Sequence, residues 1–165
     1  MLSARLADAI AGLRCWPGPR GWGRAALELA WAIPLLLLVA HLGGLIRLGG
    51  SPDPITSLQL AATLFFVPAL GEELLFRALI IPRKARRQWW LALSVALFVL
   101  WHPLQAFTFG PPWAGALLDP WFLAATAILG IALGRIYLAT SSLWPCIAAH
   151  WLIVLGWKLF FGGPF

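Results

Sequence analysis

Five of the ionisable side chains that lie inside largely apolar stretches of sequence have types and spacing that could do chemistry. Three of them are close together, Glu72, Glu73 and Arg77, and the other two are His102 and His150. A charged side chain at the centre of a membrane helix costs roughly 2.5–3.5 kcal/mol, so three unpaired charges would approach ~10 kcal/mol, comparable with the stability of a whole domain. We therefore expect each of these residues to have a compensating partner or a function.

The spacing of the two glutamates predicts different roles for them. Glu73 and Arg77 are four residues apart with the acid first, which is the favourable order for an ion pair on one face of a helix. Glu72 is rotated by about 100° from Glu73 on an α-helix, so it points to a different surface. We interpret Glu73 and Arg77 as a structural ion pair and expect Glu72 to face a cavity.

A carboxylate and two imidazoles are the groups needed to activate water. The carboxylate of Glu72 can take a proton, while one histidine orients the attacking oxygen and the other stabilises the developing charge. The structural alternative is that an intramembrane ion pair only joins helices and a lone histidine only bonds a carbonyl. We favour that alternative for Glu73 and Arg77, and a function for Glu72 with the two histidines.

The composition indicates the elements that must position these residues. The chain has 165 residues, 61% hydrophobic and 11% charged, whereas a soluble domain carries roughly 25% charged residues. Lipid is therefore the expected solvent. We predict an all-α, polytopic transmembrane bundle with about five spans in a single membrane domain, residues 25–165. The spans are expected at residues 25–46, 55–81, 89–107, 120–138 and 143–161.

The depths of the polar residues in these spans allow them to meet. At 1.5 Å per residue, Glu72 lies about 15 Å from the cytoplasmic end of its span, His102 about 20 Å and His150 about 10 Å. All three thus fall in one slab of roughly 10 Å.

The basic residues predict the orientation of the chain. Residues 1–24 form a basic N-terminal segment, in which residues 1–13 are expected to be a short interfacial helix. We predict a protein of the cell (inner or plasma) membrane with its N-terminus in the cytoplasm and its C-terminus outside. In this orientation the basic residues on the outer side are only Arg47 and Lys158. The inside set is Arg5, Arg14, Arg20, Arg24, Arg83, Lys84, Arg86, Arg87 and Arg135. We interpret the net charge of +6 as a consequence of this topology. The expected partners are membrane lipids, and no nucleic acid is expected to bind.

Three motifs on successive spans carry a resemblance to a known family. They are EELLFR at residues 72–77, FVLWH at residues 98–102, and a last span entered through SLWP at residues 142–145 and carrying His150. Over roughly residues 60–161 the chain resembles the CPBP family, which includes type II CAAX prenyl endopeptidases and lysostaphin resistance protein A-like membrane proteins.

The resemblance implies a glutamic-type intramembrane endopeptidase acting on membrane-associated proteins or peptides, prenylated ones among them. It implies that Glu72 is the general base, that His102 helps to hold the water and that His150 belongs to the oxyanion site. Glu73, Arg77 and Phe98 would support the site. No cofactor is expected; a zinc-dependent version with Glu72, His102 and His150 as ligands is the alternative.

One residue departs from the family pattern. The family usually has Asn or Asp four residues after the last histidine, where this chain has Val154. Losing one oxyanion donor typically lowers turnover by roughly 10²–10³. Gln105 and Trp157 are candidate substitute donors. Val154 also supports an alternative hypothesis, in which the chain is a non-catalytic membrane protein that acts in immunity or partner binding. The absence of an evident inverted repeat argues against a third reading, a proton- or ion-coupled transporter.

Overall fold

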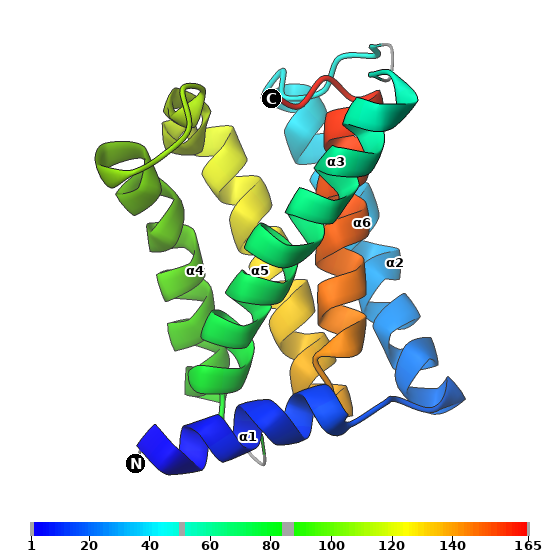
Figure 1. Ribbon diagram of the computed structural model, residues 1–165, viewed down its shortest axis with the longest axis vertical. Helices are drawn as coiled ribbons and strands as arrows, with labels where there is room; N and C mark the ends of the chain where they lie inside the picture. Colours follow the sequence, from blue (N-terminus) through cyan, green and yellow to red (C-terminus); the bar gives the residue numbers. More distant parts are fainter. Residues whose placement is uncertain (1, 50–51, 84–87, 165) are drawn as a thin grey trace.

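The computed structural model describes residues 2–49, 52–83 and 88–164, and all regular structure in them is helical. The predicted basic loop continues into residues 84–87, which lie outside the described residues, as do residues 50–51. The helices follow one another along the chain as shown in Figure 1: α1 Leu2–Arg14, α2 Pro19–Leu42, α3 Pro54–Leu64, η1 Phe65–Glu72, η2 Leu74–Leu79, α4 Gln88–Thr108, η3 Ala114–Leu118, α5 Pro120–Thr140 and α6 Trp144–Phe160.

Four helical stretches are long and apolar enough to cross a membrane: Pro19–Leu42, Pro54–Leu79, Gln88–Thr108 and Pro120–Thr140. The last helix, α6, is equally apolar in character but shorter, with 17 residues. The all-α bundle with about five spans is therefore confirmed. The protein is an integral membrane protein, and its long helices run side by side between two ends (Figure 1).

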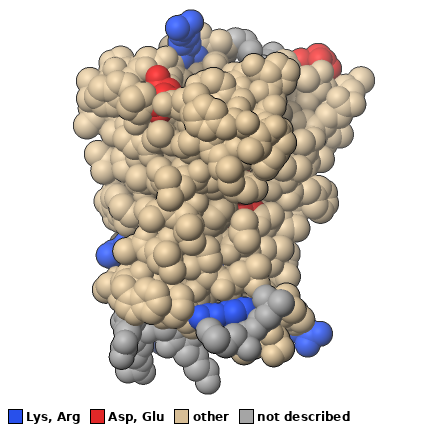
Figure 2. All heavy atoms as spheres, turned by 90° about the vertical axis from the view of Figure 1, so that its left-hand side faces the viewer, with Lys and Arg blue, Asp and Glu red and all other residues tan. Residues whose placement is uncertain are grey.

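The two ends of the bundle differ. Helix α1, predicted as a short surface helix, lies across one end, and the C-terminus lies at the other (Figure 1). On the face drawn in Figure 2, charged side chains gather toward these two ends, and the broad band between them consists almost wholly of other residues. Such a band is what a lipid-facing surface requires.

Local sequence explains where two spans begin. Pro54 and Pro120 open α3 and α5, where a missing N–H costs nothing. The residue before each proline is an aspartate that caps the helix. One Oδ1 of Asp53 accepts from the N–H groups of Ile55 and Thr56, and Asp119 caps α5 in the same way.

The second predicted span is confirmed as the helical stretch Pro54–Leu79, but it is not one regular α-helix. After Leu64 the backbone widens into π-helical turns, η1 and η2. Pro68 lies inside η1 and has no N–H to donate to the carbonyl of Leu64. In a regular α-helix its ring would also crowd that carbonyl. A π turn relieves this crowding and is frequent at functional sites.

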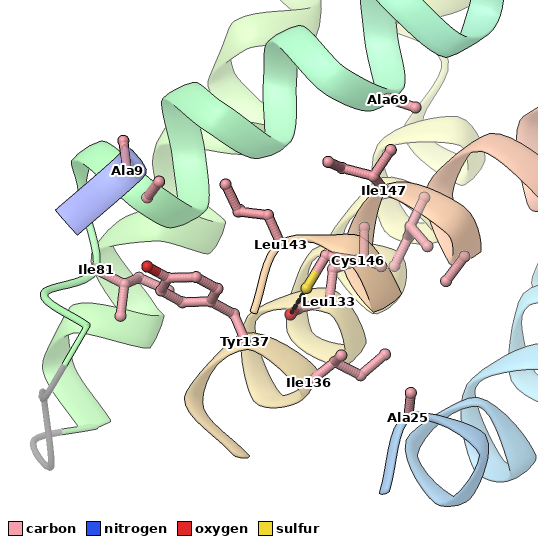
Figure 3. Close-up of a cluster of buried hydrophobic side chains, with 13 residues drawn as sticks. Ala9, Ala25, Ala69, Ile81, Leu133, Ile136, Tyr137, Leu143, Cys146 and Ile147 are labelled. Atoms are coloured by element: carbon pink, nitrogen blue, oxygen red, sulfur yellow. Dashed lines mark hydrogen bonds between the residues drawn. The ribbon is translucent and has the colours of Figure 1, made fainter. Parts of the chain in front are cut away.

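A buried apolar cluster joins the helices near the end that carries α1. It contains side chains from α1, α2, η2, α5 and α6, among them Ile81, Leu133, Tyr137 and Ile147 (Figure 3). The Sγ of Cys146 donates to the carbonyl of Leu133 within this cluster, 3.3 Å away. Cys146 therefore packs as a small buried residue. The cluster supports the helices from which the polar site is built.

Candidate active site

The predicted ion pair is confirmed and completely buried. The Nε of Arg77 donates to Oε2 of Glu73 at 3.0 Å, and neither side chain is exposed. Nη1 of Arg77 donates to Oγ of Ser94 at 2.8 Å, and that hydroxyl donates to the carbonyl of Phe76 at 2.7 Å. The guanidinium also lies over the ring of Phe98, 4.7 Å from its centre. These contacts compensate a charge that would otherwise be stranded in an apolar interior.

Glu73 has a second partner that the sequence did not reveal. Its Oε1 lies 3.0 Å from Nδ1 of His150, on a different helix. A carboxylate paired with Arg77 is ionised and can only accept, so Nδ1 of His150 is the donor. Glu73 thus links the second span to α6 and sets the orientation of the imidazole. The interpretation of Glu73 as a partner of Arg77 alone was incomplete.

Glu72 carries a buried oxygen without a partner. Its Oε1 accepts from the indole N–H of Trp101 at 3.1 Å. Its Oε2 has no hydrogen-bond partner among the described residues and lies 3.9 Å from Nε2 of His150. A buried acceptor left unpaired costs about 1–3 kcal/mol, so this oxygen is a natural position for a water or a substrate group.

Trp101 is a site residue that sequence reasoning missed. It directly precedes His102 within the FVLWH motif. The available signal was its indole N–H, because a tryptophan in a membrane span needs an acceptor for this group. Through that N–H, α4 holds one oxygen of Glu72 and directs the other one away from Trp101.

His102 has its ring fixed by its own helix. Its Nδ1 lies 2.9 Å from the carbonyl oxygen of Phe98. A carbonyl can only accept, so Nδ1 carries the proton and Nε2 of the neutral ring keeps a lone pair. The ring packs edge-on against Phe98 and Phe122, with centres 5.2 and 5.4 Å away. His102 is therefore arranged to accept a hydrogen bond through Nε2.

Phe98 packs against Arg77 and against both histidines. It contacts Arg77 as described, and its ring centre is 5.2 Å from that of His102 and 5.8 Å from that of His150. Gly130 of α5 leaves room for it, because a Cβ there would lie 3.0 Å from Cδ1 of Phe98. The phenyl ring thus packs edge-on against both imidazoles.

One cavity of about 590 Å³ brings the predicted residues together. Glu72, His102 and His150 all line it, and so does Phe98, while Glu73 and Arg77 do not. The expectation that Glu72 faces a cavity is therefore confirmed. Most other lining residues are apolar, among them Leu36, Leu117 and Leu129.

The two candidate substitute donors differ in availability. Val154, Gln105 and Trp157 all line the cavity. The indole N–H of Trp157, however, donates to the carbonyl of Leu45 at 2.8 Å. A single N–H committed to that carbonyl is not offered to a ligand. Gln105, partly buried, is the donor that this arrangement favours.

Glu72, His102 and His150 are the ligands that the zinc alternative requires. Within residues 2–49, 52–83 and 88–164, no group of three or more His, Cys, Asp or Glu side chains is placed to hold a metal ion. Glu73, the acid bonded to His150, is itself neutralised by Arg77. The zinc-dependent version, with Glu72 and the two histidines as ligands, therefore stays an alternative prediction.

The comparisons with known proteins bear on this same region. The family model for Rce1-like proteins, described as type II CAAX prenyl endopeptidase, matches residues 54–156, which is more than half of the 165-residue chain. The matched stretch includes Glu72, His102 and His150. No curated protein and no solved structure matches the chain.

Proposed function

Since the chain belongs to the Rce1-like family of type II CAAX prenyl endopeptidases, a protease family, we propose that it cleaves peptide bonds of membrane-associated proteins or peptides and that Glu72 is its general base. The observation that carries this proposal is the unpartnered Oε2 of Glu72, which faces a cavity also lined by His102 and His150. A base, a water-orienting acceptor and a group able to bind an oxyanion are the parts that acyl transfer to water requires.

In this proposal Glu72 and His102 together hold the attacking water. The water donates one hydrogen bond to Oε2 of Glu72 and the other to Nε2 of His102. As its oxygen bonds to the peptide carbonyl carbon, Glu72 takes up the proton, and the carbonyl oxygen becomes negative. When the C–N bond breaks, Glu72 returns this proton to the leaving nitrogen, which yields an amine and a carboxylic acid.

His150 and Gln105 face the developing negative charge. Because Nδ1 of His150 donates to Glu73, Nε2 can donate to an oxyanion only when the ring is protonated. The carboxamide of Gln105 supplies a second donor in place of the side chain that Val154 lacks. No step of this scheme passes through a metal ion.

The cavity wall suggests the class of substrate. Its lining is mainly aliphatic and aromatic, contributed in part by α2, α5 and α6. Such a wall favours a substrate with an apolar body, such as a membrane segment or a lipid-modified peptide, prenylated ones included. The scissile bond would lie where Glu72 and the two histidines meet the cavity.

Proteolysis by the purified protein tests the proposal. Wild type, Glu72→Gln and the control Glu28→Gln are incubated with membrane-associated peptides, with and without a strong chelator, and products are identified by mass spectrometry. Glu28 is a matched control because it lies in α2 and pairs with the half-exposed Arg135. We expect Glu72→Gln to lose roughly 10²–10⁴ in rate, Glu28→Gln to keep activity, and chelation to have no effect.

Other outcomes would identify the alternatives. Loss of activity on chelation, with recovery on adding zinc, would establish the zinc-dependent version. Full activity of Glu72→Gln would show that the base is wrongly assigned. If wild type is inert on every peptide and Glu72→Gln leaves the cellular phenotype unchanged, the non-catalytic reading replaces the protease.

A further inference from the structure

A second hollow lies at the end of the bundle that carries α1, apart from the cavity of the candidate active site. It is an open groove of about 560 Å³, and its walls combine apolar side chains with two guanidinium groups. It is lined by Ala7, Ile10, Ala11, Arg14, Cys15 and Arg83. Because α1 lies across this end (Figure 1), the groove opens where a membrane-spanning bundle meets the lipid headgroups.

Arg83 is held in a defined position at this groove. Its Nε donates to the carbonyl of Ser141 at 3.1 Å, and its backbone carbonyl accepts from the hydroxyl of Ser141 at 3.2 Å. Its backbone N–H donates to Oδ2 of Asp8 at 3.3 Å. The guanidinium is thus anchored through one nitrogen, and its planar fork can still offer paired N–H groups to an anion.

The positive charge of this end is not balanced by acids. Among the described residues, no carboxylate forms an ion pair with Arg14 or Arg83, and Asp8 is engaged by Arg5 at 3.9 Å. Glu28 and Glu73 pair with Arg135 and Arg77. Asp53 and Asp119 cap α3 and α5, which begin at the opposite end of the bundle (Figure 1).

We propose that this groove binds the phosphate of an anionic phospholipid between Arg14 and Arg83, with an acyl chain along α1. Basic pockets at the ends of membrane spans are suited to such headgroups. A lipid fits better than free phosphate because Ala7, Ala11 and Ile10 line the groove. Beside it, Leu6 and Ile10, one turn apart on α1, are 50% and 51% exposed.

The site is linked to the catalytic segment by direct packing. Helix α1 packs against η2, the segment that carries Arg77, and Arg83 follows η2 after a short turn. A lipid held by Arg14 and Arg83 therefore ties α1 to the end of the span that presents Glu72 and Glu73. We expect bound lipid to stabilise this span against local opening.

The test uses the purified protein in phosphatidylcholine nanodiscs with phosphatidylglycerol added as a minority lipid. Binding is followed by native mass spectrometry and by the midpoint of thermal unfolding. We expect wild type to retain phosphatidylglycerol and to unfold at a higher temperature with it. Arg14→Gln/Arg83→Gln should bind this lipid roughly 30-fold more weakly. The control Arg20→Gln/Arg24→Gln removes two exposed arginines of the adjoining N-terminal part of α2 and should behave as wild type.

Several outcomes would overturn the proposal. One is an equal loss of lipid binding in the control variant, which would indicate an effect of general surface charge. The others are unchanged lipid binding in the groove variant and no retention of phosphatidylglycerol by wild type. If inorganic phosphate displaces the lipid and raises the midpoint equally, the site takes a free anion. Should the double variant not fold, Arg14→Gln and Arg83→Lys are tested singly, since lysine keeps the charge but not the paired donors. Unweakened lipid binding in both would equally refute the site.

Discussion

Two adjacent glutamates in one membrane span have separate environments, and this separation is the basis of the proposed chemistry. Glu73 is surrounded by donors, with Arg77 on one oxygen and His150 on the other. Glu72 has one oxygen held by Trp101 and one that no described residue contacts through a hydrogen bond. Glu73, whose two oxygens both have hydrogen-bond donors, can hold the site together. Glu72, which has one oxygen without a donor, can react.

Replacing Glu73 should therefore reduce stability rather than remove a reacting group. Glu73→Gln leaves the guanidinium of Arg77 buried without a counterion, which typically costs about 3–5 kcal/mol. We expect a lower yield of folded protein and a lower midpoint of thermal unfolding in detergent, with Glu72→Gln as the control that stays near wild type. Arg77→Ala should be similarly damaging.

A double variant separates this effect from simple loss of packing. Glu73→Gln/Arg77→Met removes both charges, so it should be more stable than Glu73→Gln alone. If Glu73→Gln unfolds at the same temperature as wild type, the ion pair is not a structural element of the fold.

Val154 is the residue at which a donor can be restored. It lies one helical turn beyond His150 and lines the same cavity. If the oxyanion site is incomplete, Val154→Asn should raise turnover by roughly an order of magnitude or more, as measured by initial rates on a cleaved peptide. If Gln105 already supplies the donor, Val154→Asn should change little and Gln105→Ala should lower turnover. Normal rates in both variants would exclude either residue from the oxyanion site.

At the scale of the element, the π-helical turns of the second span decide how its polar residues are presented. Pro68 is the local cause, since it interrupts the α-helical hydrogen bonds just before Glu72. Pro68→Ala restores an N–H and lets the segment tighten toward an α-helix, which rotates Glu72 relative to α4 and α6. Because a displacement of about 1 Å can lower rate by roughly 10², we expect much weaker cleavage with folding retained.

Pro34 provides the matched control for this variant. It also lies inside a membrane helix, but α2 remains α-helical around it and Pro34 does not line the cavity. Pro34→Ala should leave cleavage unchanged, while circular dichroism reports the helix content of both variants. Full activity of Pro68→Ala would mean that the widened turns do not position Glu72.

At the scale of the whole molecule, the charge distribution predicts that the end bearing α1 faces the cytoplasm. The two termini lie at opposite ends of the bundle (Figure 1), and most of the basic residues belong to the α1 side by sequence. In a protein carrying Cys15→Ser and Cys146→Ala, a new cysteine at Ala4 or at Leu48 reports each side, because both positions are exposed. An impermeant thiol reagent added outside should label Leu48→Cys, and should reach Ala4→Cys only after permeabilisation. The reverse pattern would invert the topology.

The sequence by itself determined that lipid surrounds the protein, where its helices lie and which residues are candidates for the active site. Long apolar segments imply lipid, and charges inside them imply compensation, since both follow from the cost of desolvation. The ion pair of Glu73 and Arg77 was also predictable, because a separation of four residues is a property of one helix. The caps of α3 and α5 are likewise local, formed by an aspartate before a proline.

Only the tertiary structure decided which groups meet across helices. The bonds from His150 to Glu73, from Trp101 to Glu72 and from Trp157 to Leu45 each join segments far apart in the chain. Depth along a span follows from the rise per residue, but the direction of a side chain depends on the rotation and tilt of its helix. Rotation is set by packing against neighbours, and in the second span by the turns around Pro68, neither of which an apolar pattern specifies.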